Sequence, residues 1–364
     1  MKKIGILTFH RAENYGAALQ VYALQELVNK NLGECKVIDY RDEYIEKPYS
    51  LFYFRDKKIK NIVKDFIKNI LYFNKNCGRK MAFNNFLKKI NLTESVHDIN
   101  KCENFDVYIA GSDQIWNTEI VGELSDIYTL NFNKLGARKI SYAASIGNSF
   151  IEEDMKESYK NKISQIDYIS VREEDAKKIL CEIINKEVNV VLDPTLLLKK
   201  EEWLEKINDE TKERKKYILA YYVSPDDDFF KITNSLSNKS NLKVINFAQK
   251  NKGFKNVLKS AYTQGPLEFI KLIKNAEYII CTSFHATVFS IIFNKKFFVI
   301  PHKKTGSRVT NLLDKLGIKN RVCYTLEEFE KIDYNFETDW DAVNKKLEEE
   351  RKKSIKWLEN AINN

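Results

Sequence analysis

The alternation of strand-like and helix-like segments constrains the fold most, because it runs through the chain twice. The first series begins at residues 4–9 and ends at residues 188–192, and a charged stretch, 199–216, follows it. At residues 217–223 the alternation restarts with a new strand. Strands that alternate with helices form parallel sheets with helices on both faces. The sequence therefore predicts an α/β protein with two Rossmann-like, doubly wound domains.

The length of 364 residues is also too great for one ordinary core. We predict an N-terminal domain over residues 1–205 and a C-terminal domain over residues 206–340. A charged amphipathic helix, 341–364, is expected to return to the first domain. The predicted strands are 4–9, 36–40, 106–110, 139–144, 168–171 and 188–192 in the first domain, and 217–223, 242–247, 278–281 and 297–300 in the second.

Charge and cysteine usage narrow the function classes. The net charge of +9 suits an anionic small substrate or an anionic membrane surface. Nucleic acid is not an expected partner, because no helix-turn-helix, finger or aromatic RNA-binding motif is visible. The six cysteines include no CxxC pair, so we expect no metal site and reduced thiols, as in a cytoplasmic protein. No apolar run approaches the ~18 residues of a membrane span.

The segment around His285 carries the clearest chemical signal. It lies between two strand-like runs, 278–281 and 297–300, at the start of an apolar helical stretch. Ligands of open parallel sheets bind at the carboxyl ends of strands, and helix N-termini favour anions. His285 is therefore a candidate site residue, with a purely structural histidine as the alternative. The hydroxyl side chains of the same turn can instead cap the helix: Thr282, Ser283 and Thr287.

Six short motifs stand in one order between about residue 4 and about residue 318. They are the opening strand with Asn14-Tyr15-Gly16-Ala17-Ala18-Leu19-Gln20, then Gly111-Ser112-Asp113-Gln114-Ile115-Trp116-Asn117, Ser141-Tyr142-Ala143-Ala144-Ser145-Ile146-Gly147, Ser170-Val171-Arg172-Glu173, Asp193-Pro194-Thr195 and Ser283-Phe284-His285-Ala286. Together these motifs resemble the polysaccharide pyruvyl transferase family.

The resemblance implies a fold like that of the GT-B glycosyltransferases. It also implies transfer of the enolpyruvyl-derived unit of phosphoenolpyruvate to a sugar diol of a cell-surface polysaccharide or its precursor. The products are a pyruvate ketal and phosphate. The implied partners are phosphoenolpyruvate as donor substrate, without a further cofactor, and a glycan or lipid-linked sugar as acceptor.

The family also implies roles for individual residues on the donor side. His285 matches the histidine that acts as general acid, a role that suits a side chain that ordinarily titrates near neutral pH. Arg172 matches a donor-binding arginine and can make a bidentate contact with phosphate or carboxylate, although an ion pair with a neighbouring glutamate is the alternative. Well-studied members of the family have Arg-Leu-His where this chain has Ser283-Phe284-His285, so an arginine is missing here. The predicted donor-binding residues are Arg172, Ser283, Lys304 and Arg308.

The acceptor side is predicted from the turns after the early strands. Asp113 can accept a sugar hydroxyl proton or merely cap a helix. Trp116 can stack on a sugar ring or lie in the core, and residues 14–16 can bind ligand or cap the first helix. Asp193 is expected in a structural turn. The predicted acceptor-binding residues are Asn14, Tyr15, Gly16, Ser112, Gln114 and Trp116, with Asp113 as a second catalytic residue.

Two other functions remain open at this point. A nucleotide-sugar glycosyltransferase of the same architecture is expected to have an acidic residue after the His285 segment, but residues 303–308 are basic. A non-catalytic sugar-binding relative is favoured only by Ser283.

Residues 59–72 form an amphipathic helical pattern, with lysines in and just before it. The simpler expectation is a core helix with a solvated basic face. The alternative is a helix that rests on an anionic bilayer, which would place a cytoplasmic protein at the inner face of the membrane.

Overall fold

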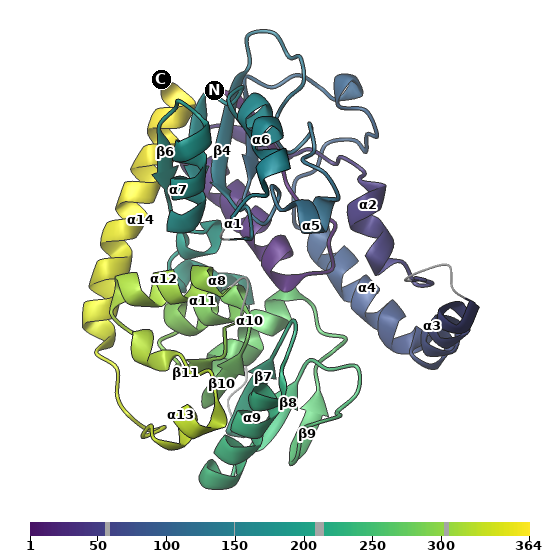
Figure 1. The fold of residues 1–364 in the computed structure, drawn as a ribbon, viewed down its shortest axis with the longest axis vertical. Coiled ribbons are helices and arrows are strands. Elements are labelled where there is room, and N and C mark those ends of the chain that lie inside the picture. Colours follow the sequence, from purple (N-terminus) through teal and green to yellow (C-terminus); the bar gives the residue numbers. More distant parts are fainter. Residues whose placement is uncertain (55–58, 149, 208–214, 302–305) are drawn as a thin grey trace. The chain divides into compact units, whose positions relative to one another are not determined.

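The computed structural model describes residues 1–54, 59–148, 150–207, 215–301 and 306–364. It divides the chain into two compact units (Figure 1). The first unit comprises Met1–Ser50, Leu87–Leu198 and Leu347–Asn364. The second comprises Leu51–Phe86 and Lys199–Lys346.

The first unit is built on a six-stranded sheet in the order β2-β1-β3-β4-β5-β6, and all its strand pairs are parallel. The chain moves outward from β1 in one direction and then from β3 in the other. Because such crossovers are right-handed, their connecting helices lie on opposite faces of the sheet. The strands are β1 (Lys3–Leu7), β2 (Glu34–Val37), β3 (Val107–Gly111), β4 (Arg138–Ala144), β5 (Tyr168–Val171) and β6 (Val188–Val190).

Several helices of the first unit begin where a polar side chain satisfies free backbone N–H groups, although α6 and α7 have no such cap. Asn14 caps α1 by accepting hydrogen bonds from the backbone N–H groups of Gly16 and Ala17 at 2.8 and 3.3 Å. The α-helices are α1 (Tyr15–Asn31), α2 (Glu43–Glu46), α5 (Thr118–Val121), α6 (Lys156–Ile163) and α7 (Glu174–Ile183). The 3-10 helices are η1 (Lys47–Tyr49), η2 (Ile99–Lys101), η3 (Glu153–Met155) and η4 (Pro194–Leu196).

The second unit has a five-stranded parallel sheet in the order β11-β10-β7-β8-β9. Its strands are β7 (Tyr217–Tyr221), β8 (Lys243–Asn246), β9 (Val257–Ser260), β10 (Tyr278–Cys281) and β11 (Lys296–Val299). Its helices are α3 (Ile59–Leu71), α4 (Phe73–Leu87), α8 (Lys200–Ile207), α9 (Asp227–Ser240), α10 (Pro266–Asn275), α11 (Phe284–Ile292), α12 (Ser307–Leu316), η5 (Lys319–Arg321) and α13 (Leu326–Glu330).

The last helix, α14 (Trp340–Asn363), belongs to the first unit from Leu347 onward. Its side chains bond to backbone groups that follow β6. Arg351 donates from Nε to the carbonyl of Leu196 at 2.8 Å, and Ser354 Oγ accepts from the Leu192 N–H at 3.0 Å. These bonds give buried backbone groups of the segment after β6 polar partners inside their own unit.

Three features differ from the sequence-based expectation. Residues 51–86 group with the second unit, although we expected them in the first domain. The two units divide at Leu198 and Lys199, and part of the expected linker, residues 208–214, lies outside the described residues. Strand β9 was not predicted, because its partly exposed residues show no apolar alternation.

None of the helices in the described parts of the chain is both long and apolar enough to cross a membrane.

Candidate functional site

The first unit has its topological switch point between β1 and β3. The carboxyl ends of these adjacent strands continue into Thr8 and Ser112, both of which are buried. Ligands of open α/β sheets bind outside this edge. The side chains that follow β1 and β3 are therefore the first candidates for a binding site.

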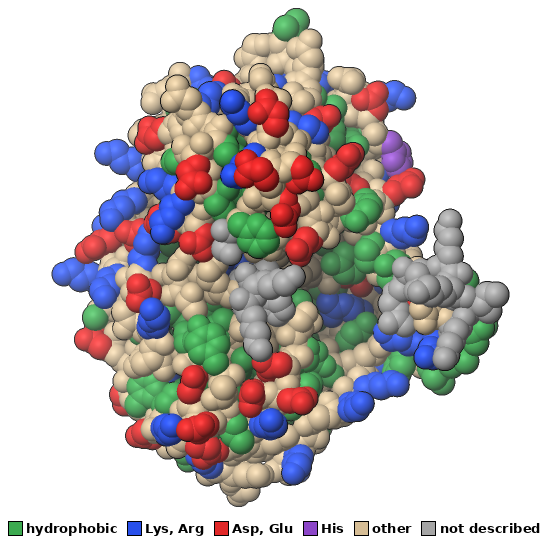
Figure 2. Space-filling model, in the orientation of Figure 1, with side chains coloured by type: hydrophobic (Ala, Val, Ile, Leu, Met, Phe, Trp, Pro, Cys, Tyr) green, Lys and Arg blue, Asp and Glu red, His purple; other side chains and the backbone are tan. Residues whose placement is uncertain are grey.

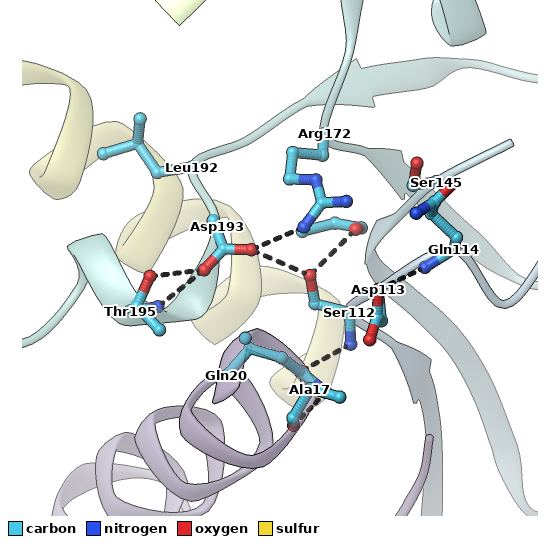
Figure 3. A network of polar contacts seen from close by, with 12 residues as sticks. Ala17, Gln20, Ser112, Asp113, Gln114, Ser145, Arg172, Leu192, Asp193 and Thr195 are labelled. Atoms are coloured by element: carbon cyan, nitrogen blue, oxygen red, sulfur yellow. Dashed lines mark hydrogen bonds and ion pairs between the residues drawn. The ribbon is translucent and has the colours of Figure 1, made fainter. Parts of the chain in front are cut away.

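Ser112 is the centre of the polar network at this edge (Figure 3). Its backbone N–H donates to Gln20 Oε1 at 3.0 Å, and its carbonyl accepts from Thr8 Oγ1 at 3.2 Å. Gln20 Nε2 in turn donates to Thr8 Oγ1 at 3.0 Å. The closed set of bonds joins α1 to the ends of two strands and fixes the turn that carries Asp113.

Arg172 and Asp193 form a buried ion pair beside Ser112. Arg172 Nη1 donates to Asp193 Oδ2 at 2.8 Å, and the Ser112 hydroxyl lies 3.3 Å from the same oxygen (Figure 3). Asp193 Oδ1 accepts from the backbone N–H and hydroxyl of Thr195 at 3.0 and 2.6 Å. The two carboxylate oxygens of Asp193 therefore have different roles, since one caps η4 and the other holds the guanidinium.

Three carboxylates act on the charge of Arg172. Burial lowers the pKa of its guanidinium, but the negative charges of Glu173, Asp193 and Asp113 outweigh burial and raise the pKa. Arg172 therefore stays charged, and its surroundings are negative rather than positive. The sequence left an ion pair with a glutamate as the alternative; Glu173 Oε1 lies 3.6 Å from Arg172 Nε, but the closer partner is Asp193.

Gly111 and Asp113 form the tight turn after β3. Gly111 has a φ of +136°, and a Cβ there would lie 2.1 Å from the carbonyl oxygen of Tyr142, so a side chain does not fit. Asp113 also has a positive φ, +74°, and its Oδ1 accepts from the Gln114 N–H at 2.8 Å. It does not cap α5, because Asn117 is the capping residue of that helix.

The other predicted acceptor residues have structural roles in the first unit. Asn14 caps α1, and Tyr15 and Gly16 are buried in its first turn. Gln114 accepts a hydrogen bond from Asn117 Nδ2 at 2.8 Å. Trp116 is fully buried, and its Nε1 donates to the carbonyl of Tyr128 at 3.0 Å, so of the two alternatives the core position holds and the sugar-stacking role is wrong for this structure.

A second polar cluster follows β1 and β2, and it was not predicted from the sequence. His10 Nε2 lies 2.9 Å from Asp39 Oδ1, and Arg11 Nε donates to the same oxygen at 2.6 Å. Burial alone raises the pKa of Asp39, but hydrogen bonds from His10, Arg11 and Ser95 outweigh it and hold that pKa well below its usual range. The signal available in the sequence was the position of these residues just after two adjacent strands.

The second unit has its switch point between β7 and β10, and His285 follows β10. Ser283 caps α11: its hydroxyl accepts from the Ala286 N–H at 3.5 Å. Thr282 does not cap α11; its hydroxyl accepts from the Val223 N–H at 3.1 Å, which joins the loops after β10 and β7. The cap places His285 in the first turn of α11, with 8% of the residue exposed.

The remaining predicted donor residues follow β11, the strand next to β10. Arg308 lies in the first turn of α12, a helix whose N-cap, Gly306, supplies no side-chain hydrogen bond. Lys304 lies outside the described residues. Over the described residues, no group of three or more His, Cys, Asp or Glu side chains is arranged to hold a metal ion.

Two parallel sheets with polar side chains at the carboxyl edges of their switch points define a two-domain, Rossmann-like α/β protein. The sequence places it further: the chain belongs to the polysaccharide pyruvyl transferase family, a family of transferases that matches residues 14–304. The matched segment contains His285, Asp113 and Arg172.

Several solved structures are similar to this chain over nearly its whole length. The structure of UDP-N-acetylglucosamine 2-epimerase from Rickettsia bellii is 12% identical, with a TM-score of 0.51, over 100% of this chain and 97% of that chain. UDP-GlcNAc 2-epimerase from Methanocaldococcus jannaschii is 14% identical, with a TM-score of 0.49, over 94% of this chain and 95% of that chain. E. coli heptosyltransferase WaaC with ADP is 10% identical, with a TM-score of 0.39, over 96% of this chain and 99% of that chain. No curated protein matches the chain. The prediction of two Rossmann-like domains is confirmed by the two parallel sheets, and the likeness to the Rickettsia bellii structure agrees with it.

Proposed function

We propose that this protein transfers the enolpyruvyl-derived unit of phosphoenolpyruvate to a sugar diol of a cell-surface polysaccharide or its precursor, forming a pyruvate ketal. The observation that carries the proposal is the family match over residues 14–304, which includes the His285 segment. The position of His285 after β10, at a switch point, supports it independently of the match.

The reaction begins with a proton delivered to the methylene carbon of the enol phosphate. His285 supplies this proton as general acid. One sugar hydroxyl then adds to the neighbouring carbon, the bond from that carbon to the phosphate oxygen breaks, and the second hydroxyl adds to complete the ketal. Two hydroxyl protons are released for the one proton consumed, and phosphate leaves.

The donor anion is assigned to the second unit. The N-termini of α11 and α12 follow adjacent strands, and helix N-termini attract anions through their free N–H groups. Arg308 adds positive charge in the first turn of α12, and in the sequence Lys304 precedes that helix by three residues. Ser283 contributes a helix cap and no charge. In this proposal, Arg308 and Lys304 supply the positive charge of the missing arginine.

The acceptor is assigned to the first unit. Asp193 and Glu173 are buried at this edge, whereas Asp113 is partly exposed, and a partly exposed carboxylate can accept hydrogen bonds from sugar hydroxyls. Asp113 is the group proposed to orient the attacking hydroxyl. Arg172 was predicted to bind the donor; we now propose that it acts mainly by holding Asp193, because three carboxylates already surround it.

Titration calorimetry with phosphoenolpyruvate and with a panel of nucleotide-sugars tests the proposal. We expect heat of binding with phosphoenolpyruvate and phosphate release when a glycan with a free diol is added. Binding of a nucleotide-sugar without any response to phosphoenolpyruvate would assign the protein to the glycosyltransferases instead. Binding of glycans without either donor would assign it to non-catalytic relatives.

A further inference from the structure

Helix α3 carries its apolar side chains on an exposed face. A helix that packs on a core buries such a stripe. In α3, six apolar residues are instead exposed to solvent, with exposed fractions from 36% to 69%. The expectation of a core helix is therefore wrong for residues 62–71. The exposed apolar residues are Ile62, Val63, Phe66, Ile67, Ile70 and Leu71.

The buried side of α3 is polar. Asp65 and Asn69, one turn apart on the same face, are both buried. Asn69 Nδ2 donates to the carbonyl of Tyr53 at 3.2 Å. Because a buried polar group is costly without its partner, this contact fixes the rotation of α3 and keeps the apolar face outward.

The next helix, α4, anchors this segment to the second unit. Lys75 Nζ donates to the carbonyl of Gln249 at 2.9 Å, and Gln249 Nε2 donates to Asn76 Oδ1 at 2.8 Å. Arg79 Nη1 donates to the carbonyl of Tyr262 at 3.1 Å, and its guanidinium lies over the Tyr262 ring at 5.2 Å. The unit thus holds the apolar helix through α4.

Lysines line the apolar face of α3. Lys64 and Lys68 are exposed one turn apart, and residues 57–68 contain five lysines and one aspartate. Where Figure 1 labels α3, Figure 2 shows hydrophobic side chains beside Lys or Arg side chains. An apolar stripe beside a lysine row is typical of helices in the interface of an anionic bilayer. Two copies of α3 packed face to face would bring like charges together, which disfavours self-association.

We propose that α3 docks on the surface of an anionic lipid bilayer. Its apolar face enters the boundary between headgroups and acyl chains, and Lys64 and Lys68 contact the lipid phosphates. This inference does not depend on the pyruvyl transfer reaction, because it rests on α3 and α4 alone.

Co-sedimentation of the full chain with vesicles tests the proposal. One set of vesicles contains phosphatidylcholine alone, and the other also contains phosphatidylglycerol. We expect partition into the second set, weakening as salt is raised, because salt screens exposed charges.

Three variants separate the apolar contribution to vesicle binding from the electrostatic one. Phe66→Asp should weaken partition by roughly tenfold or more, since it removes a large buried apolar group from the lipid-bound state. Lys64→Glu with Lys68→Glu should weaken it by about thirtyfold, the equivalent of about 1 kcal/mol for each lysine lost. Lys352→Glu with Lys356→Glu makes the same charge change at the same spacing on an exposed face of α14 and should leave partition unchanged.

Thermal unfolding of each variant checks that the fold is retained, which is expected because all the changed side chains are exposed. Equal binding to both sets of vesicles, or loss of binding in the α14 variant as well, would overturn the proposal. So would a lack of vesicle binding together with a dimer that Phe66→Asp dissociates in ultracentrifugation, which would assign the face to a second copy of the chain.

Discussion

The candidate site residues at the carboxyl edges of the two sheets have different chemical surroundings. In the first unit, Asp193 and Glu173 lie beside the guanidinium of Arg172, Asp113 adds a third negative charge, and the hydroxyl of Ser112 is bonded into the same network. In the second unit, the loops after β10 and β11 carry His285, Arg308 and a hydroxyl cap on α11. A carboxylate-rich edge suits a polyhydroxyl ligand, whereas helix N-termini with a basic residue suit an anion.

The difference teaches that a matching motif does not by itself fix a residue's role. Within the matched segment, Arg172 follows β5 directly, and His285 lies in the helix that follows β10. The arginine has a buried acidic partner at 2.8 Å, while the histidine lies in the first turn of a helix whose cap is Ser283. Single substitutions at each edge can test whether the first edge is mainly structural and the second mainly chemical.

Replacement of the histidine should give the largest effect. His285→Gln keeps a hydrogen-bonding side chain but removes the acid, so turnover should fall by ~10²–10⁴ while phosphoenolpyruvate binding is largely kept. Phosphate release and calorimetry measure the two quantities. His97→Gln, at an exposed position, is the matched control and should be fully active. Full activity of the His285 variant would show that another group supplies the proton.

Loss of Arg172 should mainly reduce stability. Arg172→Ala leaves the fully buried Asp193 carboxylate without its cation, which typically costs about 3–5 kcal/mol. Urea unfolding measures the change, and Glu174→Gln, an exposed neighbour, should change stability by less than about 0.5 kcal/mol.

The Arg172→Ala variant can also contradict the interpretation that this arginine is mainly structural. If Arg172→Ala unfolds like the parent but no longer binds phosphoenolpyruvate, the arginine holds the donor after all. Arg172→Lys should restore only part of whichever property is lost, because lysine lacks the planar fork.

The cluster around Asp39 should make the first unit sensitive to acid. The folded-state pKa of Asp39 lies below the unfolded value of about 3.9, so its stabilisation is present above that value and is lost as the pH falls through and below it. Asp39→Asn should cost about 1–3 kcal/mol at neutral pH, because charge-assisted hydrogen bonds are lost. The variant should also show a weaker loss of stability between about pH 5 and pH 2 than the parent, measured by urea unfolding. Parallel pH profiles for variant and parent would contradict this assignment.

The two helix caps should give the smallest and most similar effects. Ser283→Ala and Asn14→Ala each remove a capping side chain and should cost about 1 kcal/mol in thermal unfolding. Only Ser283→Ala is expected to weaken phosphoenolpyruvate binding as well, because the N-terminus of its helix is part of the edge that we propose to hold the donor anion. Equal effects of both variants on donor binding would remove the distinction between the edges.

Local patterns predicted much of this protein. Alternating strands and helices have characteristic apolar periods, so the two parallel sheets followed from the sequence. N-caps depend on a residue and the three that follow it, so capping by Asn14 and Ser283 was among the alternatives that the sequence offered. Strand β9 was missed for the same reason: its residues carry no such pattern.

The tertiary structure decided which distant residues meet. Arg172 and Asp193 end different segments, and their pairing depends on how β5 and η4 lie in the fold. The same holds for His10 and Asp39, which follow two adjacent strands. Chain topology brings strand ends to one edge, but side-chain direction and burial choose the partners.

Helix α3 shows that an apolar pattern in the sequence does not determine what the apolar face contacts. Its period of 3.6 residues determined that one face is apolar, yet the same pattern fits a helix on a core and a helix on a membrane. The buried Asn69 and its bond to Tyr53 decided the direction of that face. The sequence by itself determined the elements and their faces, and only the packing of each unit determined what each face meets, because burial depends on residues that are far apart in the chain.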